Sequence, residues 1–229
     1  MSRRSGSASA VLGSTGGWDG FFSRLVDLAL DHGAAGLSLG VVLDGRVATY
    51  NHGFTTTTST AYAEIDLRAE LPGPAVLRSR ATRYFEDEDE TLREFPAAAP
   101  IHAETEYGAA AVLLLAARDG TAELGYLALH YVGPHRFDDA LRLRLEAAAA
   151  EVAEDLRALV TSVWPHEPGL VVAAMRSRAV VERAVGHLMA RDRTSAAQAR
   201  QALAELARQQ SSSVHDAARS LLGTDDGPS

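Results

Sequence analysis

Two prolines, Pro165 and Pro168, constrain the fold of this chain more than any other feature, because the sequence pattern is helical on both sides of them. A proline inside a helix removes a backbone hydrogen bond and clashes with the preceding turn, which costs about 3 kcal/mol. The 229 residues suffice for one large domain, or for one medium and one small domain. We therefore predict one domain over residues 17–164 and a smaller one over 165–222.

The composition is that of a globular protein: 46% of the residues are hydrophobic and 23% are charged. Residues 1–16 are rich in Ser, Gly and Ala, and we expect a disordered leader there and a disordered tail over 223–229. The chain has no run of about 18 apolar residues, so we predict no membrane span and expect a cytoplasmic protein.

The chain contains no cysteine, which excludes disulfides, thiol nucleophiles and cysteine-based metal sites. The sequence also lacks a Gly-x-Ser-x-Gly motif, a phosphate-binding glycine loop and paired catalytic acids. Its histidines show no metal-ligand spacing. We therefore predict no enzyme, no metal and no cofactor, and leave open an unknown small-molecule ligand in the N-terminal domain.

Two pairs of apolar runs predict antiparallel hairpins in the N-terminal part. Leu37–Leu43 and Arg46–Tyr50 are joined by Asp44-Gly45, a strong turn signal because both turn positions require positive φ. Ala109–Ala116 and Leu124–His130 are more uniformly apolar, which indicates buried central strands. An antiparallel sheet is the expected framework of this domain.

Helices and loops are predicted around these strands. We expect helices from Trp18 to Gly33, over Ala61–Leu71 up to the break at Pro72-Gly73-Pro74, and over Ala75–Ser79, a strand at Arg83–Phe85, a loop or strand at Thr55–Thr60, and a loop at Pro96–Pro100. The five acidic residues Glu86–Glu90 are expected to form a solvated loop rather than a metal site.

An apolar stripe with steps of three or four residues predicts a long helix after Phe137-Asp138. Its members are Leu141, Leu145, Ala148, Val152, Leu156, Leu159 and Val163. Such a stripe packs either on the domain's own sheet or on the same helix of a second copy, and the second arrangement would give a homodimer.

The chain after Gly169 is predicted to be entirely helical. The expected helices are Leu170–Met189, a second from a cap at Thr194 or Ser195 to Arg208, and a third over Val214–Leu222 after Ser211–Ser213, with Arg191–Arg193 as a loop. The net charge of the chain is −8, yet residues 169–229 hold 8 Arg against 6 Asp and Glu. This asymmetry is typical of an acidic domain joined to a nucleic-acid binder.

Several landmarks of this segment follow one family pattern. Met175-Arg176-Ser177-Arg178 matches an apolar-x-Ser-Arg step, and Val181–Met189 matches Ile-Glu-x-Ala-Lys-Gly-x-Leu-Met. Further landmarks are Ser195, Ala199, Leu203 and Ala207 in the second helix and Val214, Asp216 and Ala218 in the third. Residues 170–222 thus resemble the ANTAR domain family. The chain departs from the pattern at Val185, where the family usually has Lys, and at Arg200, where it usually has an aromatic residue.

The N-terminal part is similar to GAF domains over about residues 17–160. The resemblance rests on the Asp44-Gly45 hairpin, Pro74–Leu77 before a short strand that ends at Asp87, Leu124–Leu129, and Phe137-Asp138 at the start of the long helix. The expected fold is therefore α+β: a GAF-like antiparallel sheet flanked by helices, then an all-α three-helix ANTAR domain.

The resemblance implies a sensor-coupled regulator of transcription antitermination. An ANTAR domain of this family would bind RNA hairpins in nascent transcripts, as a homodimer, in competition with a terminator. The alternative that we keep open is a protein-interaction or dimerisation module that has lost RNA binding.

The candidate RNA contacts are arginines, whose planar cations pair with phosphate and stack on bases. They are Arg176, Arg178, Arg183, Arg191, Arg193, Arg200 and Arg208. Arg178 has an alternative partner in Glu182, four residues on. Residues 169–229 contain no Phe, Tyr or Trp for base stacking, and polar residues that could contact base edges are Gln198, Gln201, Gln209, Gln210 and His215.

Five small residues are predicted to let the helices approach one another: Ala184, Gly186, Ala199, Ala207 and Ala218. Glycine inside a helix is less favourable than alanine by about 0.5–1 kcal/mol. We therefore expect a neighbouring helix to pass where a Cβ of Gly186 would lie.

Overall fold

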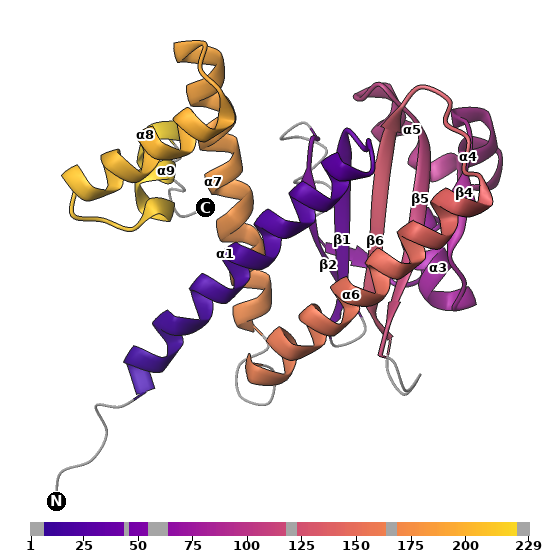
Figure 1. Ribbon diagram of the computed structural model, residues 1–229, viewed down its shortest axis with the longest axis horizontal. Coiled ribbons are helices and arrows are strands. Elements are labelled where there is room, and N and C mark those ends of the chain that lie inside the picture. The colour runs from indigo at the N-terminus through magenta and orange to yellow at the C-terminus, as the bar shows by residue number, and fades with distance from the viewer. Residues whose placement is uncertain (1–6, 44–45, 55–63, 118–122, 164–168, 224–229) are drawn as a thin grey trace, which may run out of the picture. The chain divides into compact units, whose positions relative to one another are not determined.

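The computed structural model describes residues 7–43, 46–54, 64–117, 123–163 and 169–223 (Figure 1). The chain divides into two compact units, Met1–Val172 and Ala173–Ser229, and each is described by itself. The turn at Asp44-Gly45, the segment Thr55–Thr60 and the prolines of the predicted boundary lie outside the described residues.

A six-stranded antiparallel sheet organises the N-terminal unit, in the order β3-β2-β1-β6-β5-β4. The strands are β1 (Gly36–Leu43), β2 (Arg46–His52), β3 (Glu64–Asp66), β4 (Arg83–Phe85), β5 (Tyr107–Ala116) and β6 (Glu123–Val132). Both predicted hairpins are confirmed, as β1–β2 and β5–β6. They join along β1 and β6, where Leu39 lies opposite Leu127.

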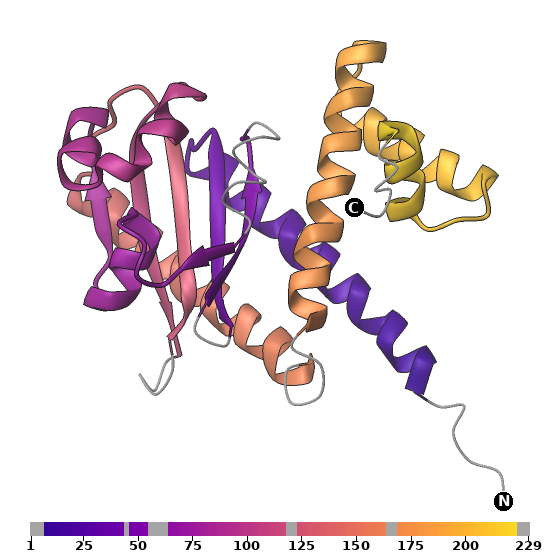
Figure 2. The ribbon, with the colours of Figure 1, turned by 180° about the vertical axis from the view of Figure 1, so that it is seen from behind.

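Helices lie against both faces of this sheet (Figures 1 and 2). The long helices α1 (Ser7–Asp31) and α6 (Asp139–Val163) contact one face and each other. The short helices α3 (Pro72–Ser79) and α4 (Glu88–Glu94) contact the sheet from the other side, and a 3-10 turn (Pro96–Ala98) leads into α5 (Ala99–Ala103).

The apolar stripe of α6 packs on its own domain. Leu145, Val152 and Leu156 are buried, and α6 lies against β5, β6 and α1. Of the two arrangements considered for the stripe, the structure therefore shows the one in which it covers the sheet.

Helix α1 begins at Ser7, so residues 7–16 are helical and the prediction of a disordered leader is wrong there. Trp18, Phe21 and Phe22 are buried and anchor the helix. Once a helix is nucleated, each added residue gains a hydrogen bond at little further cost. The helix therefore extends beyond the residues whose periodicity predicts it.

The predicted helix at Ala61–Leu71 is wrong for its described part. Glu64–Asp66 form an edge strand, in which Ile65 lies opposite Val47. The prolines that were expected to end a helix instead begin α3, since proline lacks the donor that the first helical turn leaves unsatisfied.

The acidic run also forms a helix rather than a loop. Asp87 caps α4 by accepting a hydrogen bond of 2.7 Å from the backbone N of Glu90. The Glu90 carboxylate in turn accepts from the backbone N of Glu86 at 2.9 Å. Negative charge at a helix N-terminus is stabilised by the helix dipole, so these carboxylates favour the helix. The predicted loop at Pro96–Pro100 is likewise helical, as the 3-10 turn and the start of α5.

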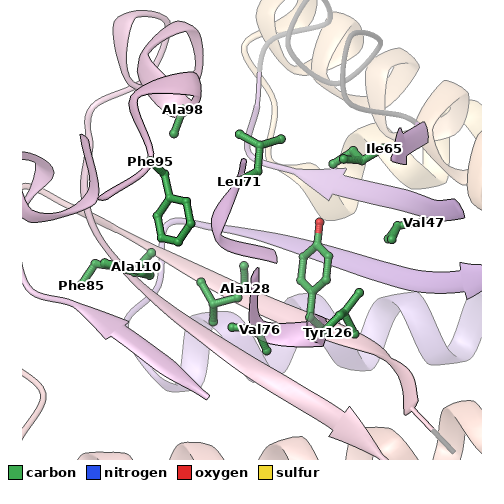
Figure 3. Packing of buried hydrophobic residues seen from close by; sticks show 12 residues of the cluster. Val47, Ile65, Leu71, Val76, Phe85, Phe95, Ala98, Ala110, Tyr126 and Ala128 are labelled. Atoms are coloured by element: carbon green, nitrogen blue, oxygen red, sulfur yellow. The ribbon is translucent and has the colours of Figure 1, made fainter. Parts of the chain in front are cut away.

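Tyr126 fills the space between the sheet and α3 (Figure 3). It is a buried member of an apolar cluster whose other labelled residues are Val47, Ile65, Leu71, Val76, Phe85, Phe95, Ala98, Ala110 and Ala128. A Cβ added to Gly40 of β1 or to Gly73 of α3 would overlap the Tyr126 ring. The two glycines thus make room for this side chain.

We expect Gly73→Ala to lower the free energy of unfolding by about 1–3 kcal/mol, because the added methyl group overpacks the Tyr126 ring. Urea unfolding of a double-mutant cycle with Tyr126→Leu checks this. In the Tyr126→Leu background the change should cost less than about 1 kcal/mol. Equal costs in the two backgrounds would contradict the assignment.

Candidate functional sites

The C-terminal unit contains α7 (Gly169–Asp192) from Ala173 onward, α8 (Ala196–Gln209) and α9 (Val214–Leu222). Ser195 and Gln198 form a capping box at the start of α8, and Ser213 caps α9 through a 3.0 Å hydrogen bond from the Asp216 backbone N. The predicted loop at Arg191–Arg193 is shorter than expected, since α7 continues to Asp192. Gly223 of the predicted tail is the left-handed C-cap of α9.

Alanines bring the three helices together. Ala184, Ala199, Ala207 and Ala218 are all buried in one apolar cluster, which allows the helix backbones to approach closely. Val185 is buried in the same cluster. Its replacement of the family's usual Lys is therefore a change in the core and not a surface cation lost from this chain.

Gly186 differs from these alanines, and its predicted packing role is wrong. The residue is exposed, and a Cβ built on it has no atom within 4 Å outside its own stretch of helix. Its neighbours Ala184, Val185 and Leu188 face the core. Because successive helical residues are about 100° apart, Gly186 lies on the outer side of α7.

Glu182 on α7 binds two arginines, one of them buried. Its carboxylate lies 2.6 Å from Arg178 on α7 and 3.4 Å from Arg200 on α8. The side chains of Arg178 and Glu182 are 9% and 13% exposed, against 43% for Arg200. Arg178 therefore pairs with Glu182, the alternative to an RNA contact that the sequence offered. Together with Arg200, this pair links α7 to α8.

We expect Glu182→Gln to lower the free energy of unfolding by about 2–4 kcal/mol, because it leaves the Arg178 guanidinium buried without a counter-charge. The matched change Arg200→Ala removes only a half-exposed pair and should cost less than about 1 kcal/mol. Urea unfolding followed by circular dichroism measures both. Similar losses for the two variants would show that the Arg178–Glu182 pair is not the important one.

The other candidate arginines are more accessible. Arg191 and Arg208 form exposed ion pairs, both at 2.7 Å, with Asp192 and Glu205. Exposed pairs of this kind contribute little to stability, and salt or phosphate competes for them. Arg176 and Arg193 are also exposed.

Among the candidate arginines, Arg183 and Arg193 have the fewest polar partners in the fold. The Nε of Arg183 is buried and makes no hydrogen bond within the described part of the chain. For Arg193, which follows α7 with a left-handed φ of 52°, no hydrogen bond or ion pair occurs among the described residues. Both cations can therefore bind a phosphate without breaking a contact of the described structure.

The outer side of α7 carries these cations together with small residues. Helical spacing places Arg176, Ala179, Arg183, Gly186, His187 and Ala190 on this side, with Arg193 just beyond the end of the helix. We call these seven residues the outer face of α7. The two acidic residues of the helix, Glu182 and Asp192, are both bound by arginines.

A polar group on the sheet of the N-terminal unit was not predicted from the sequence. Ser38 Oγ lies 3.3 Å from His130 Nε2, and the His130 ring packs against Tyr107 and Phe54 at centroid distances of 5.3 and 4.9 Å. Ser38 and His130 are polar residues within largely apolar strands, a signal that strand alternation could have revealed. Burial, with a smaller effect of His102, lowers the pKa of His130 to about 3.

We expect the free energy of unfolding to fall by about 1 kcal/mol per pH unit as the pH drops below about 6.5. In this range the unfolded chain takes up a proton on His130 that the folded chain excludes. Urea unfolding at pH 7.5 and 5.5 measures the effect. His130→Gln keeps a hydrogen-bonding side chain and should remove this part of the slope, whereas an unchanged slope would rule out His130 as its source.

No described helix is both long and apolar enough to cross a membrane. Among the described residues, no three His, Asp or Glu side chains gather where they could hold a metal ion.

Comparisons with known proteins gave one family match and several solved structures of similar fold. Residues 171–222 match the family model of the ANTAR domain. The GAF domain region of a putative membrane protein from Geobacter sulfurreducens PCA is 14% identical, with 65% of this chain and 98% of that one covered and a TM-score of 0.54. The GAF domain/HD domain protein from Geobacter sulfurreducens is 12% identical, with 64% and 95% covered and a TM-score of 0.52.

A further solved structure, the GAF-B domain of DevS from Mycobacterium smegmatis, is 19% identical, with 63% and 96% covered and a TM-score of 0.48. No curated protein matches the chain. The chain is thus an α+β protein with a GAF-like sheet domain followed by a separate helical domain. As the sequence indicated, the chain combines a GAF-like fold with a C-terminal segment that matches the ANTAR family model.

Proposed function

We propose that this protein is a sensor-coupled regulator that binds RNA hairpins in nascent transcripts and so controls transcription antitermination. The observation that carries the proposal is the ANTAR match over residues 171–222, in a unit whose helix α7 presents a basic outer face. The GAF-like domain would receive the signal, and the ANTAR domain would act on the RNA.

The charge of the outer face supports an RNA ligand. Its arginines lie about two helical turns apart, as with Arg176 and Arg183, which corresponds to about 10 Å along the axis. Arginine pairs with phosphate through two parallel hydrogen bonds. A row of such side chains without free carboxylates between them suits a polyanion better than a neutral partner.

Base recognition in this unit would rest on polar side chains. Residues 169–229 contain no aromatic residue, so stacking on Phe, Tyr or Trp is excluded. Gln198, Gln201 and Gln209 are exposed on α8 and can contact the edges of unpaired bases. Arginine can stack on those bases as a planar cation.

The second candidate function is a protein-interaction or dimerisation module without RNA binding. The pairing of Arg200 with Glu182 favours it, because one predicted RNA contact is already engaged within the fold. The burial of Val185 counts against it, since no surface cation is missing there. A partner interaction that is insensitive to salt would support this second function.

Homodimer formation, a cytoplasmic location and the absence of catalysis belong to the same proposal. The chain has no cysteine, which removes thiol-based redox chemistry from its GAF-like domain. A small molecule of unknown identity remains a candidate signal for that domain.

We expect the double variant Arg183→Ala, Arg193→Ala to bind a tandem-hairpin RNA pool at least about tenfold more weakly than the wild type near 0.15 M salt. Two lost phosphate contacts should also lower the slope of log K against log salt by about 1.4. Fluorescence anisotropy at several salt concentrations measures both quantities.

The matched control Arg136→Ala, Arg144→Ala removes the same charge from exposed positions of the N-terminal unit and should leave binding unchanged. Wild-type protein that binds no RNA would contradict the proposed function. RNA binding that survives in the Arg183, Arg193 variant would show that these arginines are not the contacts.

A further inference from the structure

Neither the backbone conformation nor the packing of the described chain requires glycine at position 186. It lies within α7, where glycine is the least favourable residue apart from proline. Its φ is not positive, and a Cβ at this position would meet open space. Alanine would therefore fit the described structure and stabilise the helix.

The surroundings of Gly186 are small and basic. Ala190 lies one turn further along the helix and is exposed, as is the adjacent His187. Arg183 lies one turn before, and Arg193 follows the end of the helix. The bare backbone at Gly186 thus lies between a half-buried cation, Arg183, and an exposed one, Arg193, and neither forms an ion pair among the described residues.

We propose that the sugar-phosphate backbone of the bound RNA crosses α7 at Gly186, with Arg183 and Arg193 holding phosphates on either side. This inference rests on the proposed function and deepens it, because it names the surface that the RNA occupies. The absent Cβ lets the RNA strand approach the helix closely, which brings its phosphates within reach of both guanidinium groups.

The charge of the face distinguishes RNA from a second copy of this chain. If two copies packed through this surface, the cations Arg183 and Arg193 would lie close to the same cations of the other copy and repel them. Met189, three residues after Gly186, is 37% exposed and is the one large apolar side chain of α7 that is exposed among the described residues. A polyanion gains from all these cations, whereas an identical helix gains from none.

Substitution of Gly186 separates a role in RNA contact from a role in the fold. In the full-length chain, Gly186→Ala should raise the Tm of the helical unit by about 2–5 °C through its helix propensity while it weakens RNA binding. Gly186→Leu should weaken binding at least about tenfold and lower the slope of log K against log salt by about 0.7–1.4, as for one or two displaced phosphates. A merely structural glycine would instead lose stability and binding together.

The probe is one tandem-hairpin RNA selected by the wild-type protein, titrated by anisotropy, with sedimentation giving the oligomeric state of each variant. Ser220→Leu adds bulk at an exposed position of α9 and serves as the control, expected to bind as the wild type does.

The inference is overturned if Gly186→Leu binds this RNA as tightly as the wild type, if Ser220→Leu is impaired as strongly, or if Gly186→Leu acts by changing the oligomeric state. It is supported if only the Gly186 variants lose affinity while they stay folded and keep their mass. Failure of the wild type to select any RNA would instead contradict the proposed function itself.

Discussion

The close approach of three helices through alanine side chains is the constraint on which the C-terminal unit depends. Short helices are marginally stable in isolation, so α8 and α9 depend on what they bury. Buried alanines at positions 184, 199, 207 and 218 allow that packing, and the Arg178–Glu182–Arg200 group ties α7 to α8. Because the core takes one side of α7, its other side stays accessible.

In the N-terminal unit, the two faces of the sheet are covered by different side chains. Leu145 and its neighbours on α6 cover one face, and on the other face Tyr126 fills the space under α3. Further along that second face lies the polar pair Ser38–His130, beside Phe54 and Tyr107. Because desolvation of the half-buried His130 ring lowers its pKa, we expect the stability of this unit to depend on pH.

The arginines of the C-terminal unit show which features of a site can be predicted from the sequence and which cannot. As a set they are visible from composition, but their roles differ with their surroundings. Arg178 is buried in an ion pair, Arg191 is paired at the surface, and Arg193 forms no hydrogen bond or ion pair among the described residues. These distinctions depend on side chains from α8 and on the end of α7, which spacing along one helix does not specify.

The sequence by itself determined the types of most elements, because hydrophobic periodicity and caps such as Ser195 act over a few residues. It also indicated a GAF-like fold in the N-terminal part and the ANTAR match in the C-terminal part. Only the tertiary structure decided that Gly186 faces outward, that the α6 stripe covers its own sheet, and that residues 7–16 continue a helix. Those outcomes depend on which surfaces meet, and surfaces meet through contacts between residues far apart in the chain.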